Sequence, residues 1–212
     1  MIYVIINDLE NTKRDCRTMR QPLNLLTGEL KEYVENTKNE KTKSERIAAY
    51  SALLISLKEL FSVENPEIER NENGKPYLKD GKVHFSISHF DGLSAVALSD
   101  SAEIGIDLQC PTDSEKEERI DKRFLNNIEF KKDDIDIKYF LLTDGTLKEF
   151  SPQKSTENDF LFRWTFLEAN IKCRGLNFSC VKDINELSKG TRAYTVKYKD
   201  CKITTVIADL KA

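Results

Sequence analysis

The segment FLFRWTFLEANIKCRG, residues 160–175, decides how the second half of the chain is organised. Read as a helix that stops at Gly175, it places Trp164, Glu168 and Lys172 four residues apart on one stripe. A glutamate and a lysine at this spacing can form a surface ion pair worth about 0.2–0.5 kcal/mol. The pair gains a chemical use where a second acidic residue and an anionic ligand lie beside it.

A second acidic residue occurs in GIDLQ, residues 105–109, which we expect to form a strand. Side chains alternate along a strand, so Gly105, Asp107 and Gln109 share one face, with the last two roughly 7 Å apart. Gly105 leaves room for another group to approach the backbone. Together with Glu168, the oxygens of Asp107 and Gln109 are hard ligands suited to Mg²⁺. The alternative interpretation is an ordinary edge strand whose polar face lies in water.

FSISH, residues 85–89, and the turn at 74–76 supply groups that suit a phosphate. Ser88 and His89 lie near the end of a predicted strand, where a hydroxyl and an imidazole can donate to phosphate oxygens, especially beside Lys75. Taken alone, the strand motif is better explained by a histidine that bonds the backbone. The glycine, lysine and proline of 74–76 are, taken alone, a turn with a lysine in it.

The remaining pattern predicts an α+β chain. Apolar residues at helical spacing predict a helix from about Ser44 to Phe61, with Ser44 as its N-cap. A second, charged helix is predicted in PTDSEKEERIDKRF (111–124), and a small hairpin in IKYFLLTDGTLKEF (137–150). The predicted strands are MIYVIINDLE (1–10), KVHFSIS (82–88), LSAVALS (93–99), EIGIDLQ (103–109), RAYTVKYK (192–199) and CKITTVIADL (201–210).

The composition limits the partners of the protein. The 212 residues suffice for one or two domains, and the net charge of −3 gives no general attraction to nucleic acid or to an anionic membrane. Any anion site must therefore be local. Nucleic-acid binding by the lysine-rich stretch 38–43 is a weaker alternative, because no paired aromatic residues lie near those lysines.

The cysteines and the start of the chain bear on its location. The count of five is odd and no C-x-x-C occurs, so we expect neither a disulfide framework nor a zinc ribbon, and a reducing cytoplasm fits. The apolar run at the start is too short for a membrane span and has no basic region before it.

Six motifs follow one another in a recognisable order. They are SERIAAYSALL (44–54), NGKPYL (73–78), FSISH (85–89), GIDLQ (105–109), KRFLNNIE (122–129) and FRWTFLEANIKCRG (162–175). In order and approximate spacing they resemble the 4'-phosphopantetheinyl transferases of the long, single-chain surfactin-synthetase type. That family has a G-K-P turn, an [FI]-x-[IL]-S-H-S strand, a G-[IV]-D-[IV]-E strand and a W-[ST]-x-K-E-A-x-x-K helix. The resemblance runs from about Ser44 to Phe178.

The resemblance implies a fold and a division of the chain. The expected fold is an α+β pseudo-dimer of two similar halves, each a long helix packed on a small, mostly antiparallel sheet. We expect residues 1–101 to contact the phosphates and adenine of coenzyme A, and residues 102–212 to carry the metal and catalytic residues. The expected protein is monomeric and cytoplasmic, with no nucleic-acid or membrane partner.

The resemblance also implies an activity of the holo-[acyl-carrier-protein] synthase type. The 4'-phosphopantetheine arm of coenzyme A is transferred to a serine of an apo acyl, polyketide or peptidyl carrier protein, and adenosine 3',5'-bisphosphate is released. The implied catalytic residues are Glu168, as base, and Lys172, while Asp107, Glu168 and Gln109 are the implied Mg²⁺ ligands. The residues implied to bind coenzyme A are Arg46, Gly74, Lys75, Pro76, Ser88, His89 and Lys172.

Three departures from the family pattern leave a second function open. Gln109 stands where the family has an acidic residue, Leu167 replaces the lysine before the glutamate, and Phe90 replaces the last serine of the strand motif. Gln109 removes one negative charge, which lowers metal affinity. The alternative is therefore a degenerate homologue that binds coenzyme A or a carrier protein without transferring the arm.

Overall fold

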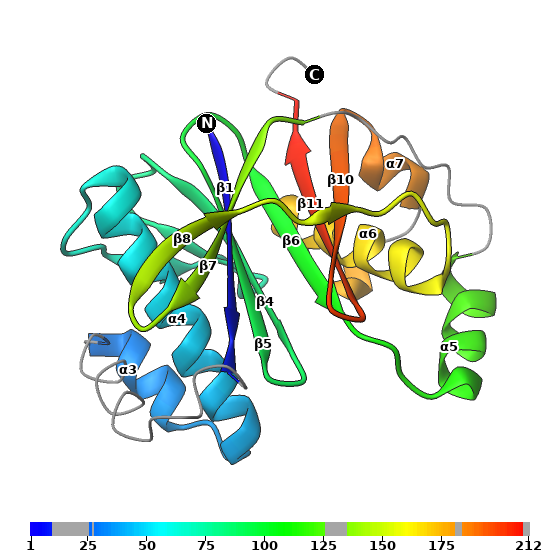
Figure 1. The fold of residues 1–212 in the computed structure, drawn as a ribbon, viewed down its shortest axis with the longest axis horizontal. Coiled ribbons are helices and arrows are strands. Elements are labelled where there is room, and N and C mark those ends of the chain that lie inside the picture. Colours follow the sequence, from blue (N-terminus) through cyan, green and yellow to red (C-terminus); the bar gives the residue numbers. More distant parts are fainter. Residues whose placement is uncertain (10–25, 27, 126–134, 181–183, 210–212) are drawn as a thin grey trace.

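The computed structural model describes residues 1–9, 26, 28–125, 135–180 and 184–209. Within them the chain has the mixed α+β fold expected from the sequence. Figure 1 shows two sheets side by side, each with one long helix against it. Residues 126–129 of the KRFLNNIE motif lie outside the described residues. None of the helices in the described part of the chain is both long and apolar enough to cross a membrane.

The first sheet carries helix α4 (Glu40–Phe61) on one face. Its strand order is β4 (His84–Phe90), β5 (Leu93–Ser99), β1 (Ile2–Asp8), β7 (Ile137–Thr143) and β8 (Thr146–Phe150). Neighbours are antiparallel except β1 and β7, which run parallel. The helix packs because Leu53 and Leu57 are fully buried against apolar side chains of the sheet such as Phe85.

The second sheet carries helix α6 (Phe160–Cys173). Its strands, all antiparallel to their neighbours, lie in the order β6 (Ile104–Gln109), β11 (Cys201–Ala208), β10 (Thr191–Tyr198) and β9 (Gln153–Lys154). Trp164 packs at the helix surface against the rings of Phe160 and Phe178, at 6.3 and 5.7 Å between centroids.

The remaining elements are short and lie around the two sheets. They are α3 (Gly28–Glu35), β2 (Ile68–Arg70), β3 (Pro76–Leu78), α5 (Ser114–Ile120), the π-helical turn η1 (Asp121–Leu125), the 3₁₀ turn η2 (Phe178–Cys180) and α7 (Ile184–Ser188). The predicted charged helix is present as α5, but it buries none of its residues. It projects from the second sheet at the lower right of Figure 1.

The start of α4 corrects the sequence prediction. The helix begins at Glu40, not at Ser44, and its N-cap is Asn39, whose side chain accepts from the backbone N–H of Thr42 at 2.9 Å. The Ser44 hydroxyl instead donates to the Glu40 carbonyl within the helix, at 2.9 Å. The first turn of α4 is polar. The helical spacing of apolar residues, on which the sequence prediction rests, therefore begins only after that turn.

The order of elements occurs twice. In the first unit β1 is followed by α4 and the β4–β5 hairpin, and β1 pairs with β5. In the second, β6 is followed by α6 and the β10–β11 hairpin, and β6 pairs with β11. The predicted hairpin at 137–150 is confirmed as β7–β8, and it extends the first sheet although it follows residue 102.

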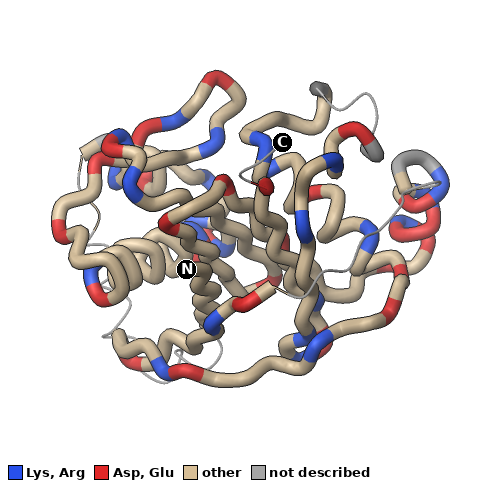
Figure 2. The backbone as a smooth tube through the Cα atoms, turned by 90° about the horizontal axis from the view of Figure 1, so that it is seen from above, with Lys and Arg blue, Asp and Glu red and all other residues tan. Residues whose placement is uncertain are grey.

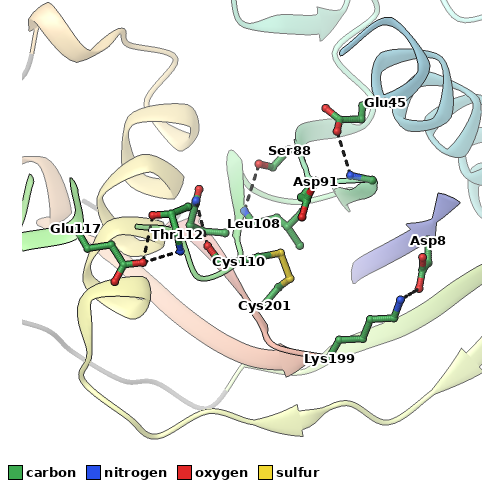
Figure 3. The surroundings of a disulfide bond; sticks show 12 residues. Asp8, Glu45, Ser88, Asp91, Leu108, Cys110, Thr112, Glu117, Lys199 and Cys201 are labelled. Carbon is green, nitrogen blue, oxygen red and sulfur yellow. Dashed lines mark hydrogen bonds and ion pairs between the residues drawn. A yellow bond between two sulfur atoms is a disulfide. The ribbon is translucent and has the colours of Figure 1, made fainter. Parts of the chain in front are cut away.

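Two serines of β4 join the sheets. The backbone N–H groups of Ile106 and Leu108 point away from β11, and an edge strand would leave them unpaired. The Ser86 hydroxyl accepts from Ile106 at 3.1 Å, and the Ser88 hydroxyl accepts from Leu108 at 3.2 Å (Figure 3). Both serines are buried, so the polar face of FSISH does not lie in water.

A disulfide links Cys110 and Cys201 (Figure 3), a pair that the odd cysteine count and the absence of C-x-x-C did not predict. The two residues are 91 positions apart, and the pairing of Gln109 with Lys202 brings their Cα atoms to 4.0 Å. Neither the cysteine count nor any local spacing reports this register. Cys173 is a buried free thiol.

Gly105 lets α6 approach β6 closely. A Cβ atom at this position would lie 1.9 Å from the Ala169 carbonyl oxygen and 2.5 Å from the Cys173 backbone nitrogen. These are backbone atoms of α6, so they cannot rotate away. The space predicted beside Gly105 is thus filled by the protein's own helix.

Gly105→Ala should therefore destabilise the protein by about 1–3 kcal/mol or more, because α6 must move off the sheet. Urea unfolding measures the change in free energy. Gly105 does not have a positive φ, so the effect reports crowding alone. Ser101→Ala, at an exposed position nearby, should unfold like the wild type. Equal midpoints for Gly105→Ala and the wild type would contradict the close approach.

Candidate active site

Asp107 is a buried carboxylate at the join between the two sheets. It lies on β6 with 3% of its surface exposed. Its Oδ1 accepts from the Ser88 hydroxyl at 2.8 Å and from the Lys172 ammonium at 2.6 Å. Its Oδ2 is buried and has no hydrogen-bond partner among the described residues. A buried carboxylate oxygen without a partner is costly, and it is the kind of group that a cation satisfies.

Helix α6 brings Glu168 and Lys172 to the same place. Their side chains lie 3.9 Å apart at the i,i+4 spacing predicted from the sequence. Burial, and then the negative charge of Asp107, raise the pKa of Glu168 from its ordinary value of 4.5 to about 7, although Lys172 opposes the shift. The two carboxylates therefore repel each other across one small space, and the ammonium lies against both.

These residues fit a hard divalent cation. Asp107 offers an oxygen without a hydrogen-bond partner, and Glu168 adds a second carboxylate. The negative charge of Asp107 disfavours ionisation of Glu168, and a cation between the two would offset that repulsion. Mg²⁺ is commonly held by one or two carboxylates while waters and phosphates fill its other positions. Among the described residues no group of three or more His, Cys, Asp or Glu side chains converges, so the carboxylates supply two ligands at most.

Gln109 is the third predicted ligand, and its place is less central. It lies on β6 two residues after Asp107, and its amide nitrogen donates to the Cys110 carbonyl at 3.3 Å. That bond turns the amide along the strand end. Its role as a metal ligand stays a prediction.

A pocket of about 260 Å³ lies next to the carboxylates. Six of the seven residues predicted to bind the cofactor line it: Arg46, Gly74, Lys75, Pro76, His89 and Lys172. They come from α4, the turn before β3, β4 and α6, so the fold gathers side chains from four separate segments. Ser88, the seventh, is not among the lining residues, and its hydroxyl bonds Asp107, Lys172 and the backbone of β6.

The turn that carries Gly74 is fastened to the end of α6. The side-chain amides of Asn71 and Asn73 both donate to the Gly175 carbonyl, at 2.9 and 3.1 Å. The side-chain oxygen Oδ1 of Asn71 also accepts from the backbone N–H of Lys75 at 2.9 Å. The pocket therefore spans the seam between the two units.

Cations on the first unit make this pocket electropositive. The Arg46 guanidinium lies 4.7 Å from the ring centre of Tyr33 and donates to Thr37 at 2.9 Å. Arg70 lies 3.8 Å from the same ring and donates to the hydroxyl of Tyr50 at 2.7 Å and to the Gly74 carbonyl at 2.9 Å. Basic and acidic residues are otherwise interspersed over the chain (Figure 2), so the gathering of basic side chains beside this pocket is local.

Lys75 is less free to add charge to the pocket. Its ammonium lies 2.7 Å from Glu103 and donates to the Cys173 carbonyl at 3.1 Å, near the end of α6. Its main effect is to hold the turn against the second unit.

His89 is held by a buried carboxylate. Its Nδ1 lies 3.0 Å from Glu45 Oε2, and the other oxygen of Glu45 accepts from the Gly92 N–H at 3.0 Å. Burial lowers the pKa of His89; Glu45 opposes this, while the charges of Lys172 and Arg46 add to it. The imidazole is therefore favoured in its neutral form until negative charge enters the pocket.

Sequence reasoning missed several residues of this site. Glu45 directly precedes Arg46 in the helix, and that adjacency was its one signal. Tyr33 and Arg70 lie in no motif, and Tyr50 lies in SERIAAYSALL without being singled out, because their contacts depend on α3 and β2 folding over α4.

A larger pocket of about 730 Å³ lies near the other end of α4. Its lysines, Lys58 and Lys79, are paired with Glu64, Glu67 and Glu69. Charges there are thus compensated on the protein surface.

No protein-family model matches the chain, and no curated protein matches it.

The raised pKa of Glu168 predicts a pH dependence of stability. Between about pH 4.5 and about pH 7 the unfolded chain releases this proton while the folded chain keeps it, so the free energy of unfolding should fall as pH rises. Glu168→Gln removes this contribution, and its stability should fall less over the same range. Urea unfolding in the presence of a chelator measures both proteins at about pH 5 and about pH 7.5.

Glu59→Gln, an exposed residue of α4, is the matched control and should behave as the wild type. Identical pH dependence in Glu168→Gln and the wild type would contradict the raised pKa of Glu168.

Proposed function

We propose that the protein is an Mg²⁺-dependent 4'-phosphopantetheinyl transferase that moves the arm of coenzyme A to a serine of an apo carrier protein. One observation carries the proposal. The residues that the family resemblance implies to bind the cofactor come from separate segments of the chain, yet they lie around one pocket, next to two carboxylates. Convergence of this kind does not follow from the motifs being present in the sequence.

The repeated order of elements supports the same proposal. A strand, a helix and a hairpin occur twice, with equivalent pairing of the first and last strands. This is what a pseudo-dimer of two halves requires, and the pocket lies at their seam. We propose that the boundary between the two halves lies between residues 101 and 102. The β7–β8 hairpin follows this boundary in the sequence but pairs with β1 of the first sheet.

In the proposed reaction the chain's residues bind, orient and move a proton. Arg46 and His89 would hold a phosphate in the pocket, since a guanidinium offers several donors and a protonated imidazole one. Glu168, with a pKa of about 7, would accept the proton of the carrier serine near neutral pH. The serine oxygen then attacks the β-phosphate, and adenosine 3',5'-bisphosphate leaves.

Lys172 and the metal ligands would manage the charge of the diphosphate. Lys172 lies one helical turn from Glu168 and would offset charge on the departing phosphate. Asp107 and Glu168, with Gln109 as a further candidate, would hold Mg²⁺, which when bound neutralises charge on the diphosphate oxygens. Ser88 would orient Asp107 through its hydrogen bond.

A second function, binding of coenzyme A or a carrier protein without transfer, is favoured by one observation. Leu167, where the family has a lysine, is buried in the core beneath α6, with 1% of its surface exposed. A lysine cannot be restored there without removing core packing. Gln109 also supplies one charge fewer than the family pattern.

The proposed partners are coenzyme A and an acyl, polyketide or peptidyl carrier, and the proposed state is a monomer in the cytoplasm. The disulfide weighs against a strongly reducing compartment, because cytosolic thiols are usually kept reduced.

Mixing the protein with coenzyme A, Mg²⁺ and apo carriers of the three classes tests the proposal by mass spectrometry. We expect a carrier to gain the mass of one phosphopantetheine arm. Asp107→Ala and Glu168→Ala should each slow the reaction by about 10²–10⁴-fold, because each removes a group that acts on the reacting atoms. Glu59→Ala, an exposed carboxylate on α4, should keep the full rate.

Full rates in both site variants would contradict the assignment of the metal and base. Coenzyme A binding without any gain in carrier mass would favour the binding function.

A further inference from the structure

Glu45 is a buried carboxylate that the proposed reaction does not use. It lies on the first half of α4, with 6% of its surface exposed. One of its oxygens contacts His89 and the other accepts from Gly92, in the turn between β4 and β5. Figure 3 shows the hydrogen bond from the backbone of this turn to Glu45. A carboxylate with both oxygens engaged is held in a single orientation.

The contact with Glu45 decides which nitrogen of His89 carries the proton. An ionised carboxylate only accepts hydrogen bonds, so Nδ1 must be the donor in the neutral imidazole. Nε2 is then the nitrogen left for a ligand, and His89 lines the pocket. We propose that Glu45 is a positioning residue that fixes the Nδ1–H tautomer of His89, so that Nε2 is the nitrogen that takes up a proton when an anionic group of the ligand binds.

The anionic group is taken here to be a phosphate of coenzyme A, and in that respect the inference rests on the proposed function. His89 faces Glu45 and Arg46 of α4 and Lys172 of α6. Near the turn, Lys41 and Asp91 pair with each other at 2.6 Å. A phosphate at Nε2 would place the ring between two anions and favour its protonated form. Phosphate binding should therefore take up a proton and tighten as pH falls.

The turn makes a sharp variant possible. In Glu45→Gln the amide oxygen must stay on the Gly92 N–H, because that group can only donate. The amide NH₂ then faces His89 Nδ1, which must become the acceptor. The neutral ring should switch to the Nε2–H tautomer, although the side chain keeps its size.

Nitrogen-15 NMR of protein labelled at histidine measures the tautomer directly. The chain has two histidines, so His84→Gln assigns the signals of His89. We expect neutral His89 to be Nδ1–H in the wild type and Nε2–H in Glu45→Gln. Glu103→Gln is the matched control, since Glu103 contacts His84 in the same way at 3.0 Å, and it should leave His89 unchanged.

An Nε2–H tautomer in the wild type would overturn the inference, and this result does not depend on the variant folding. An unchanged Nδ1–H tautomer in folded Glu45→Gln would overturn it as well.

Calorimetry measures the affinity for coenzyme A and the proton uptake when it binds. The Kd should rise about tenfold in Glu45→Gln, the loss expected for one charge-assisted contact, and proton uptake on binding should decrease. Glu59→Gln should bind as the wild type. If the wild type did not bind coenzyme A, the proposed function would fail, while the NMR result would still decide the role of Glu45.

Discussion

The contact of α6 with β6 at Gly105 is the constraint on which the rest of the site depends. The backbone of the helix lies where any other side chain would need to be. This distance sets Glu168 and Lys172 over Asp107, and it lets a salt bridge of 2.6 Å form inside the protein. The serines of β4 complete the arrangement. Ser86 bonds the free edge of β6, and the Ser88 hydroxyl donates to Asp107 and orients it.

The charges of the site are arranged in two neighbouring groups. Asp107 and Glu168 bring negative charge to the seam, where the raised pKa of Glu168 reports its cost. Arg46 and Lys172 give the adjoining pocket positive character. A divalent cation would neutralise the carboxylates, and a ligand with several phosphates would neutralise the basic side chains. Only the two together would compensate both groups.

Much of the fold was predictable from local patterns. The α6 helix, the β7–β8 hairpin and the i,i+4 pair of Glu168 and Lys172 follow from period, turn residues and spacing. Contacts between distant segments were not predictable from such patterns. Ser86 and Ser88 satisfy the edge of β6 only because the two sheets pack in one register. Glu45 meets His89 only because α4 packs against β4. The family resemblance implied which residues would gather, but not what holds them.

The disulfide shows the same limit. Cys110 and Cys201 are joined by strand pairing across 91 residues, and no property of either sequence neighbourhood reports it. It fastens β6 to β11 directly after Gln109, at the end of the strand that carries Asp107. The disulfide therefore holds the end of β6 in place against β11, and β6 is the strand that positions Asp107.

A crystal structure with coenzyme A and Mg²⁺ bound tests the central claim most directly. The account predicts the ion between Asp107 and Glu168, the diphosphate beside Lys172, and a phosphate against Arg46 and His89. A ligand bound elsewhere, or an empty seam with the two carboxylates turned apart, would contradict it.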